Sequence, residues 1–372
     1  MSEIPENARF ATRAVHAGLW PDPHYGSIVP AIHQTSTYVQ PAPGEFVGEY
    51  EYSRAANPTR RALEDALGEL EGGYGTAFGS GMAAEHALIT AVCAAGDHIV
   101  LPNDLYGGTY RLVDKILGRW GLTYTMVDQR DLDALERAIR PETKVVWVET
   151  PTNPTLNVID VRGVIERAGD ALVVVDNTFA TPVHQRPLEL GAHAVVHSTT
   201  KYLGGHSDTI SGALIVADQE LHQKVRLVQK AVGAIPGPLD CFLVHRGLRT
   251  LHLRVAAHDA NGLAVSTWLR DAPGAYDVRW PGFGGMVAFR HPEAARIASA
   301  TRVFSLAESL GGVESLIEVP QIMTHKTVED SAAAVPPDLI RLSCGVEAAE
   351  DLVEDLAQAI GVPVASGAAV SN

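Results

Sequence analysis

Hydrophobic positions in the first half of the chain switch between helical spacing and short continuous apolar runs. Leu63, Leu67 and Leu70 recur at intervals of three and four residues, which predicts a helix. Asn57-Pro58 is suited to begin this helix, because a polar cap and a proline in the first turn are typical of helix starts. Gly72-Gly73 then ends it.

The apolar runs that follow predict strands, and helical patterns separate several of them. The predicted strands are Tyr74–Phe78, His98–Leu101, Thr123–Val127, Val145–Glu149, Leu172–Asp176, Ala194–His197 and Ala213–Val216. Helices are predicted from Met82, over Thr109–Trp120 and over Leu132–Ile139. Continuous apolar strands separated by helices are typical of parallel sheets buried on both faces. We therefore expect a mostly parallel α/β domain over residues 57–247.

The two ends of the chain follow other patterns. Residues 1–56 lack clear periodicity, which predicts an extended arm. Residues 248–372 begin with a predicted long helix, Leu248–Leu269, and continue as a smaller α/β domain. The last residues, after Gly361, have few large apolar side chains, so we expect a loose tail.

Composition fits a globular protein with two linked domains. The chain has 372 residues, of which 46% are hydrophobic and 20% charged. It has neither an apolar run long enough for a membrane span nor the pattern of a signal peptide, so the cytoplasm is the expected location. The net charge of −15 and the lack of a basic block argue against nucleic acid as a partner.

Metal binding is also disfavoured. The three cysteines, Cys93, Cys241 and Cys344, lie far apart, which argues against a disulfide framework or a zinc knuckle. His193 and His197 flank a predicted strand and do not share a helix face. We expect no metal site.

Two charged residues follow predicted buried strands. Asp176 ends the run Leu172–Asp176, and Lys201 lies just after Ala194–His197. Ligands of open α/β sheets bind at the carboxyl ends of strands. For either residue alone, a solvent-exposed loop charge is the better explanation.

Neighbouring polar residues make a cofactor site the better interpretation. Pyridoxal phosphate needs a lysine amine for a Schiff base, an acid that keeps its ring nitrogen protonated, and donors for its phosphate. Ser198 and Thr200 flank Lys201, and Ser80-Gly81-Met82 begins a predicted helix whose free amides favour an anion. This set predicts a pyridoxal-phosphate site.

Longer motifs resemble the cysteine and methionine metabolism family of pyridoxal-phosphate enzymes. The clearest are Val-Val-Val-Asp-Asn-Thr-Phe-Ala at residues 173–180 and His-Ser-Thr-Thr-Lys-Tyr-Leu-Gly-Gly-His-Ser-Asp at residues 197–208. Further landmarks in the same order are Glu51-Tyr-Ser-Arg, Asn57-Pro-Thr-Arg, Ser80-Gly-Met-Ala-Ala, Tyr106-Gly-Gly-Thr, Glu149-Thr-Pro-Thr-Asn-Pro and Ala307-Glu-Ser-Leu-Gly-Gly. The resemblance covers nearly the whole chain.

The resemblance implies an aspartate-aminotransferase-like fold of type I. Its large domain has a mostly parallel seven-stranded sheet that binds pyridoxal 5′-phosphate, and a smaller α/β domain follows. It also implies a homotetramer, a dimer of dimers with active sites at the dimer interface. The arm of residues 1–56 would contact a neighbouring subunit.

Individual roles are implied by the same resemblance. Lys201 would carry the cofactor as a Schiff base, Asp176 would pair with the ring nitrogen, and Tyr106 would stack on the ring and act as an acid. The phosphate would be held by Ser80, Gly81, Met82, Ser198 and Thr200, and by Tyr52 and Arg54 of a neighbouring subunit. The amino-acid substrate would be bound by Arg341, Asn153, Glu314, Ser315 and Arg111.

Family members catalyse several reactions, and Glu314 narrows the choice. A glutamate there accompanies enzymes that act on cystathionine at Cγ, whereas an aromatic residue would suggest β-lyases. The hypothesis is γ-elimination, the cystathionine γ-lyase reaction, which turns L-cystathionine into cysteine, 2-oxobutanoate and ammonia. Alternatives are γ-replacement on an O-acylated homoserine with cysteine (the cystathionine γ-synthase reaction), a related reaction on a specialised substrate, and a cofactor-binding protein without catalysis.

Two further observations bear on these alternatives. A nicotinamide oxidoreductase is disfavoured because no Gly-x-Gly-x-x-Gly follows the first predicted strand. The chain is shorter than is usual in the family at residues 278–283, in the C-terminal domain. We expect this difference to spare cofactor binding and to bear on substrate access.

Overall fold

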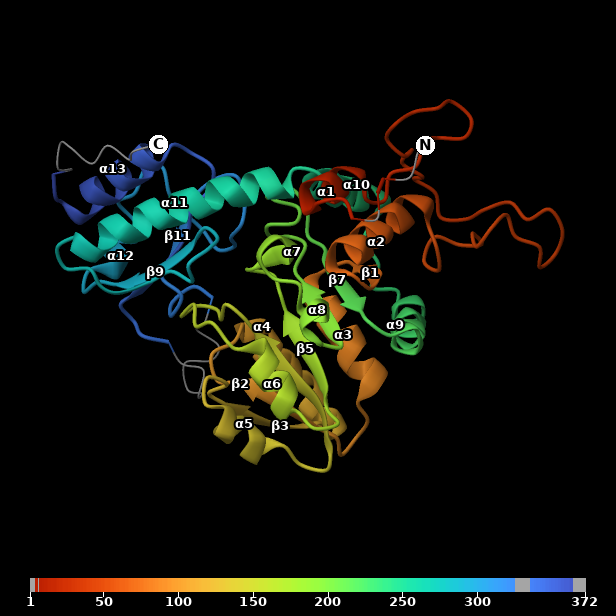
Figure 1. Ribbon diagram of the computed structural model, residues 1–372, viewed down its shortest axis with the longest axis horizontal. Coiled ribbons are helices and arrows are strands. Elements are labelled where there is room, and N and C mark those ends of the chain that lie inside the picture. Colours follow the sequence, from red (N-terminus) through yellow and green to blue (C-terminus); the bar gives the residue numbers. More distant parts are fainter. Residues whose placement is uncertain (1–3, 6, 325–334, 364–372) are drawn as a thin grey trace.

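The computed structural model describes residues 4–5, 7–324 and 335–363, and it shows two sheets with a long helix alongside them (Figure 1). The tail predicted after Gly361 falls largely on residues 364–372, outside the described residues. The larger sheet has seven strands in the order β1-β7-β6-β5-β4-β2-β3. Its strands are β1 (Tyr74–Phe78), β2 (His98–Pro102), β3 (Thr123–Val127), β4 (Thr143–Glu149), β5 (Leu172–Asp176), β6 (Ala194–His197) and β7 (Gly212–Val216).

The mostly parallel, seven-stranded sheet is confirmed. Neighbours from β6 to β3 are parallel, and β7 is antiparallel to both β1 and β6. Helices cover both faces: α2 (Pro58–Glu71), α3 (Gly81–Val92), α5 (Leu132–Ala138), α6 (Val161–Arg167), α7 (Thr181–His184), α8 (Pro187–Leu190) and α9 (Gln219–Val232).

Successive residues of the central strands are buried on opposite faces. Trp147 of β4 packs in the same cluster as Leu88 of α3, whereas Val146 and Val148 pack with Leu135 of α5. A strand covered on both sides gains from apolar residues at every position. This explains the continuous apolar runs in the sequence.

The prediction of one regular helix over Thr109–Trp120 is wrong. The segment winds as α4 (Gly107–Arg111), a π-helix η1 (Leu112–Ile116) and a 3-10 helix η2 (Leu117–Trp120). A π turn joins residues five apart, so it brings Leu112 and Leu117 to the same side. Both leucines lie in the core cluster beside α3, which the uniform helical spacing did not predict.

The predicted helix Leu248–Leu269 is present, but it begins and ends later in the chain than predicted. The structure has α10 (Pro238–Leu248) and, after a break at residues 249–250, α11 (Leu251–Asp271). The second sheet has the order β10-β11-β12-β9-β8. Its elements are β8 (Tyr276–Arg279), β9 (Met286–Arg290), β10 (Ser305–Leu306), β11 (Leu316–Glu318) and β12 (Leu339–Ser343), with helices α12 (Ala294–Ala298) and α13 (Ala349–Ile360).

The N-terminal arm is extended except for one helix. Ala14 of helix α1 (Phe10–His16) and Ala17, directly after it, pack in a cluster with Leu63 of α2, so the expectation of an extended chain was wrong there. The following residues run outward as loops, at the right of Figure 1. Apolar side chains stand in solvent on them: Tyr25 is 92% exposed and Val39 is 89% exposed. Such an exposed apolar arm suits contact with another chain.

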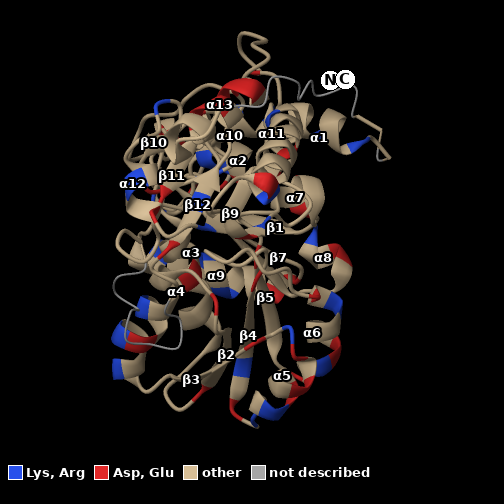
Figure 2. Ribbon diagram, turned by 90° about the vertical axis from the view of Figure 1, so that its left-hand side faces the viewer, with Lys and Arg blue, Asp and Glu red and all other residues tan. Residues whose placement is uncertain are grey.

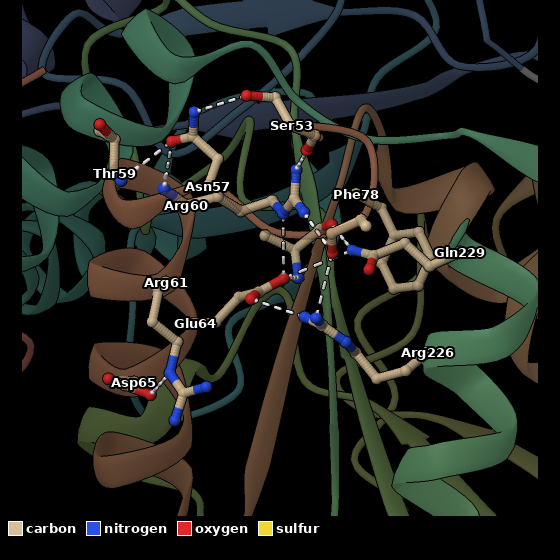
Figure 3. A network of polar contacts seen from close by, with 12 residues as sticks. Ser53, Asn57, Thr59, Arg60, Arg61, Glu64, Asp65, Phe78, Arg226 and Gln229 are labelled. Atoms are coloured by element: carbon tan, nitrogen blue, oxygen red, sulfur yellow. Dashed lines mark hydrogen bonds and ion pairs between the residues drawn. The ribbon is translucent and has the colours of Figure 1, made fainter. Parts of the chain in front are cut away.

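Buried polar contacts fix the end of this arm to the large sheet (Figure 3). Glu64 of α2 accepts hydrogen bonds from the Ala77 amide of β1, at 3.1 Å, and from Arg226 of α9, at 2.9 Å. Arg60, which pairs with Glu64 at 3.5 Å, donates to the Ser53 carbonyl at 2.7 Å. The cluster therefore ties together the arm, α2, β1 and α9.

Charges of both signs are interspersed on the surface helices α5 and α6, as Figure 2 shows. This distribution does not offer the one-signed basic face that nucleic acid needs. Within the described residues, none of the helices combines the length and the apolar character that a membrane span requires.

Candidate active site

A cavity of about 250 Å³ lies at the carboxyl ends of β4, β5 and β6, and β12 of the second sheet contributes to its wall. The structure brings most of the predicted site residues together there. Those that line the cavity are Ser80, Gly81, Met82, Tyr106, Asn153, Asp176, Ser198, Thr200, Lys201 and Arg341.

Asp176 lies at the end of β5, where the sheet pairs it directly with Glu149 at the end of β4. It accepts a hydrogen bond from the Thr178 amide at 2.9 Å. Burial raises the pKa of Asp176, and the bonds from Thr178 oppose this change. A buried carboxylate of this kind is stabilised by a cation opposite to it. Asp176 therefore suits a protonated ring nitrogen.

Lys201 points its amine into the cavity. Its Nζ atom donates to the hydroxyl of Ser309 at 2.7 Å. Burial, followed by the nearby charge of Arg341, lowers the pKa of Lys201 from its ordinary 10.5 to about 8. The amine is thus available as a nucleophile near neutral pH.

The lowered pKa of Lys201 predicts an unusual labelling profile in the cofactor-free protein. Acetylation by limiting acetic anhydride should reach half its plateau near pH 8 for Lys201. The exposed Lys224, whose pKa Glu220 raises, serves as an internal control and should still gain label at about pH 10. Mass spectrometry of both peptides from one sample measures this. Parallel profiles for the two lysines would contradict the assignment.

The start of α3 forms a cradle for an anion. Ser80 caps the helix by accepting from the Ala83 amide at 3.1 Å, which leaves the first helical amides, Gly81 and Met82, without intrahelical partners. A Cβ atom at Gly81 would lie 3.1 Å from the Cα and Cβ atoms of Ser198, so a larger residue would crowd the cradle. Thr200 also lines it, although its hydroxyl donates to the Ser211 carbonyl at 3.0 Å. A phosphate group fits this donor set.

Tyr106 forms a flat wall of the cavity. Its backbone amide donates to Glu149 at 2.9 Å, and its ring lies against Gly108, where a Cβ atom would come within 2.3 Å of the ring. Burial raises the pKa of the Tyr106 hydroxyl. A fixed, protonated tyrosine ring can stack on an aromatic ligand and can donate a proton.

Arg341 reaches the cavity from β12 of the second sheet. Its guanidinium donates to Asn153 at 2.8 Å and to the Ser309 carbonyl at 2.8 Å, and it pairs with Glu318 at 3.1 Å. Arg341 is 3% exposed and lies on an inner strand of the sheet. A buried guanidinium in this position suits the binding of a carboxylate.

Tyr52 and Arg54 do not line the cavity of their own chain. They border a separate shallow groove with Gly233 and Ile235. The guanidinium of Arg54 lies 5.6 Å from the centre of the Tyr52 ring, and Tyr52 is 46% exposed. The two residues are therefore placed at the surface, outside the cavity of their own chain.

Three predicted substrate residues also lie outside the cavity lining. Glu314 accepts a hydrogen bond from Ser207, and Arg111 lies close enough to Tyr106 for its charge to act on that hydroxyl. Ser315 is fully buried, and its hydroxyl donates to Glu347 at 2.8 Å. In this chain, Ser315 fixes a loop of the second domain.

Several cavity residues were missed by sequence reasoning. Glu149 ends a predicted buried strand, as Asp176 does, so the same strand-end signal could have found it. Ser309 lies in a quoted motif and adopts a strained positive φ of 90°. Glu85 carried no local signal, because a single acidic residue in a helix is common. The same holds for Glu318, which lies outside the lining but pairs with Arg341.

The shortened segment of residues 278–283 also lies outside the lining. Phe283 packs against the ring of His184, with 4.7 Å between ring centres. The neighbouring Gly284 amide is bonded to Asp259 of α11. The segment is thus anchored to α7 and α11, away from the anion cradle, and its effect on substrate access stays a prediction.

Taken together, the cavity offers an amine nucleophile, a buried carboxylate, an anion cradle, a flat aromatic wall and a carboxylate-binding arginine. These are the groups needed to hold an anionic aromatic aldehyde and an amino acid side by side.

Comparison with known proteins agrees with this chemistry. A family model described as Cys/Met metabolism PLP-dependent enzyme matches residues 11–361. The chain is 48% identical to a cystathionine γ-synthase of Mycobacterium tuberculosis, over 94% of this chain and 96% of that protein. It is 44% identical to a cystathionine β-lyase of Lactococcus lactis, over 94% and 98%.

The fold of this chain also matches that of a solved structure. The cystathionine γ-lyase of Lactobacillus plantarum, complexed with L-serine, superimposes with a TM-score of 0.91 at 40% identity. The match covers 95% of this chain and 98% of that one. The chain therefore belongs to the Cys/Met metabolism family of pyridoxal-phosphate-dependent enzymes.

Proposed function

We propose that this enzyme makes or breaks the Cγ–S bond of L-cystathionine. The proposal rests on one observation: Lys201, Asp176 and Arg341 line the same cavity in a chain that belongs to this family. Its relatives named as cystathionine enzymes support the substrate class.

When bound, pyridoxal phosphate supplies an aldehyde that links to amines and a ring that accepts electrons from the substrate Cα atom. We assign its phosphate to the cradle of Ser80, Gly81, Met82, Ser198 and Thr200. We assign the ring nitrogen to Asp176, which would hold a proton there. Asp176 is half-buried at the end of β5, and its reduced contact with water strengthens that charge pair.

Lys201 would serve twice. Its Nζ atom would hold the cofactor covalently and, once the substrate amine has replaced it, would take the proton from the substrate Cα atom. The lowered pKa near 8 suits both tasks. Ser309, which already accepts a hydrogen bond from this atom, would orient it.

Arg341 and Asn153 would hold the substrate carboxylate, which fixes the Cα–H bond toward Lys201. Tyr106 would cover the ring and give a proton to the departing sulfur. The roles of Glu314, Ser315 and Arg111 stay predictions, since these residues lie outside the cavity lining.

Tyr52 and Arg54 would complete a neighbouring subunit's phosphate site. Their position outside the cavity of their own chain supports this arrangement, as do the exposed apolar side chains of the arm. We therefore propose a homotetramer that is built from two dimers. We also propose the cytoplasm as its location. The division into an arm, a cofactor domain and a C-terminal domain at residues 56 and 247 is part of the same proposal.

Two reactions at Cγ are candidates. The sequence interpretation is γ-elimination, the γ-lyase reaction. The second candidate is γ-replacement, the γ-synthase reaction, and a specific observation favours it: identity is 48% to the γ-synthase of Mycobacterium tuberculosis and 43% to a γ-lyase of Homo sapiens.

Product analysis separates these reactions. With L-cystathionine alone, 2-oxobutanoate indicates γ-elimination, whereas pyruvate indicates β-elimination. With O-succinylhomoserine and cysteine, formation of cystathionine indicates γ-replacement. A visible cofactor band without any product from these substrates would overturn the proposed reaction and leave a specialised substrate or a non-catalytic role.

A further inference from the structure

The proposed mechanism gives no role to Glu85, a polar side chain of the cavity. Glu85 lies on α3 and lines the cavity together with Asp176 and Glu149. It is 3% exposed. The Thr109 hydroxyl lies close enough to the Glu85 carboxyl to oppose the rise of its pKa, but no partner within hydrogen-bond geometry reaches Oε2 of Glu85 or Oγ1 of Thr109 among the described residues. A buried oxygen without a partner is costly, which points to a ligand that completes it.

The position of Glu85 on α3 indicates which ligand. Glu85 follows Gly81 by four residues, so both lie on the same face of the helix, one turn apart. Gly81 belongs to the anion cradle. A molecule whose phosphate lies in the cradle and whose ring faces Asp176 therefore passes the carboxyl of Glu85.

The surroundings of Glu85 favour its neutral form. The neighbouring charges come from carboxylates, with Asp176 foremost, and not from a cation. Glu149 is already held by the backbone amides of Tyr106 and Asn153, which donate to its two oxygens. Burial, followed by the charge of Asp176, raises the pKa of Glu85 well above its ordinary value. A neutral carboxyl is a hydrogen-bond donor.

We propose that Glu85 is a further cofactor-binding residue, whose protonated carboxyl donates a hydrogen bond to the bound pyridoxal phosphate. The inference rests on the proposed function only through the cofactor and its placement in the cradle. Glu85 is a second acid of the pocket, distinct from Asp176: Asp176 acts as an anion opposite the ring nitrogen, and Glu85 acts as a neutral donor.

Two variants of the full-length protein test this role. Glu85→Met keeps similar volume and removes the donor, so the dissociation constant of pyridoxal phosphate should rise about tenfold, which corresponds to about 1.4 kcal/mol. Glu85→Gln keeps a neutral donor and is the matched control, with affinity within about threefold of wild type. Titration followed by visible absorbance and by quenching of protein fluorescence measures both.

Further readouts separate this role from a structural one. The cofactor-free Glu85→Met protein should melt at the wild-type temperature or above it, because the substitution removes an unpartnered polar group. Competition by inorganic phosphate should be unchanged if the contact lies beyond the cradle.

Wild-type affinity in Glu85→Met would overturn the inference. An equal tenfold loss in both variants would also overturn it, since the group would then act as an anion. Failure of the wild-type protein to bind pyridoxal phosphate would instead contradict the proposed function.

Discussion

Lys201→Ala is expected to lower turnover of every amino-acid substrate by roughly 10³-fold or more. The Nζ atom of Lys201 lies in the cavity beside Ser309 with a pKa near 8, and the proposed mechanism uses it both to hold the cofactor and to move the proton from Cα. No other lysine lines the cavity within the described residues. The visible band that arises from the cofactor–lysine link should also disappear.

Steady-state kinetics and the visible spectrum together check this result. Lys224→Ala is the control, because Lys224 is exposed on α9, where it pairs with Glu220, and does not line the cavity. It should keep wild-type turnover and the band. Turnover of Lys201→Ala within tenfold of wild type would exclude Lys201 as the catalytic lysine.

The second large effect is expected at Arg341, where stability and substrate binding depend on one side chain. Arg341 and Glu318 form an ion pair in which both side chains are at most 3% exposed. Arg341→Ala leaves the Glu318 carboxylate buried without its cation, which costs roughly 3–5 kcal/mol. The same variant lacks the carboxylate-binding group, so KM should rise at least about 30-fold.

A double variant separates the two effects. In Arg341→Ala/Glu318→Gln the buried charge is gone, so the denaturation midpoint should return toward that of the wild type. KM should stay high, because no guanidinium is restored. A double variant as unstable as Arg341→Ala would mean that the pair does not control stability. Arg341→Lys, which keeps the charge but not the planar fork, should give an intermediate KM.

Local sequence patterns were sufficient to predict the large sheet and part of the site. The predicted runs in β4, β5 and β6 are continuously apolar up to a polar last residue, because helices cover both faces of the sheet. Asp176 ends one such run and Lys201 comes four residues after another, so their place at the ligand-binding edge follows from the fold class. The roles of Tyr106, Asn153 and Arg341 came only from resemblance to the family.

Other features depended on contacts between distant segments. The π turn at Leu112–Ile116 exists because Leu112 and Leu117 both pack on the core beside α3. Ser315 was predicted to bind the substrate. In the structure, its hydroxyl donates a hydrogen bond to Glu347 inside the second domain.

By itself, therefore, the sequence determined the alternation of strands and helices, the family and the two residues at strand ends, because each of these is written in adjacent positions. Only the tertiary structure decided that Arg341 of β12 reaches Asn153 and that Lys201 meets Ser309. It also decided that Glu85, Glu149 and Asp176 share one buried wall. The physical reason is that the charge state and the partners of a buried group are set by neighbours that the chain brings together only on folding.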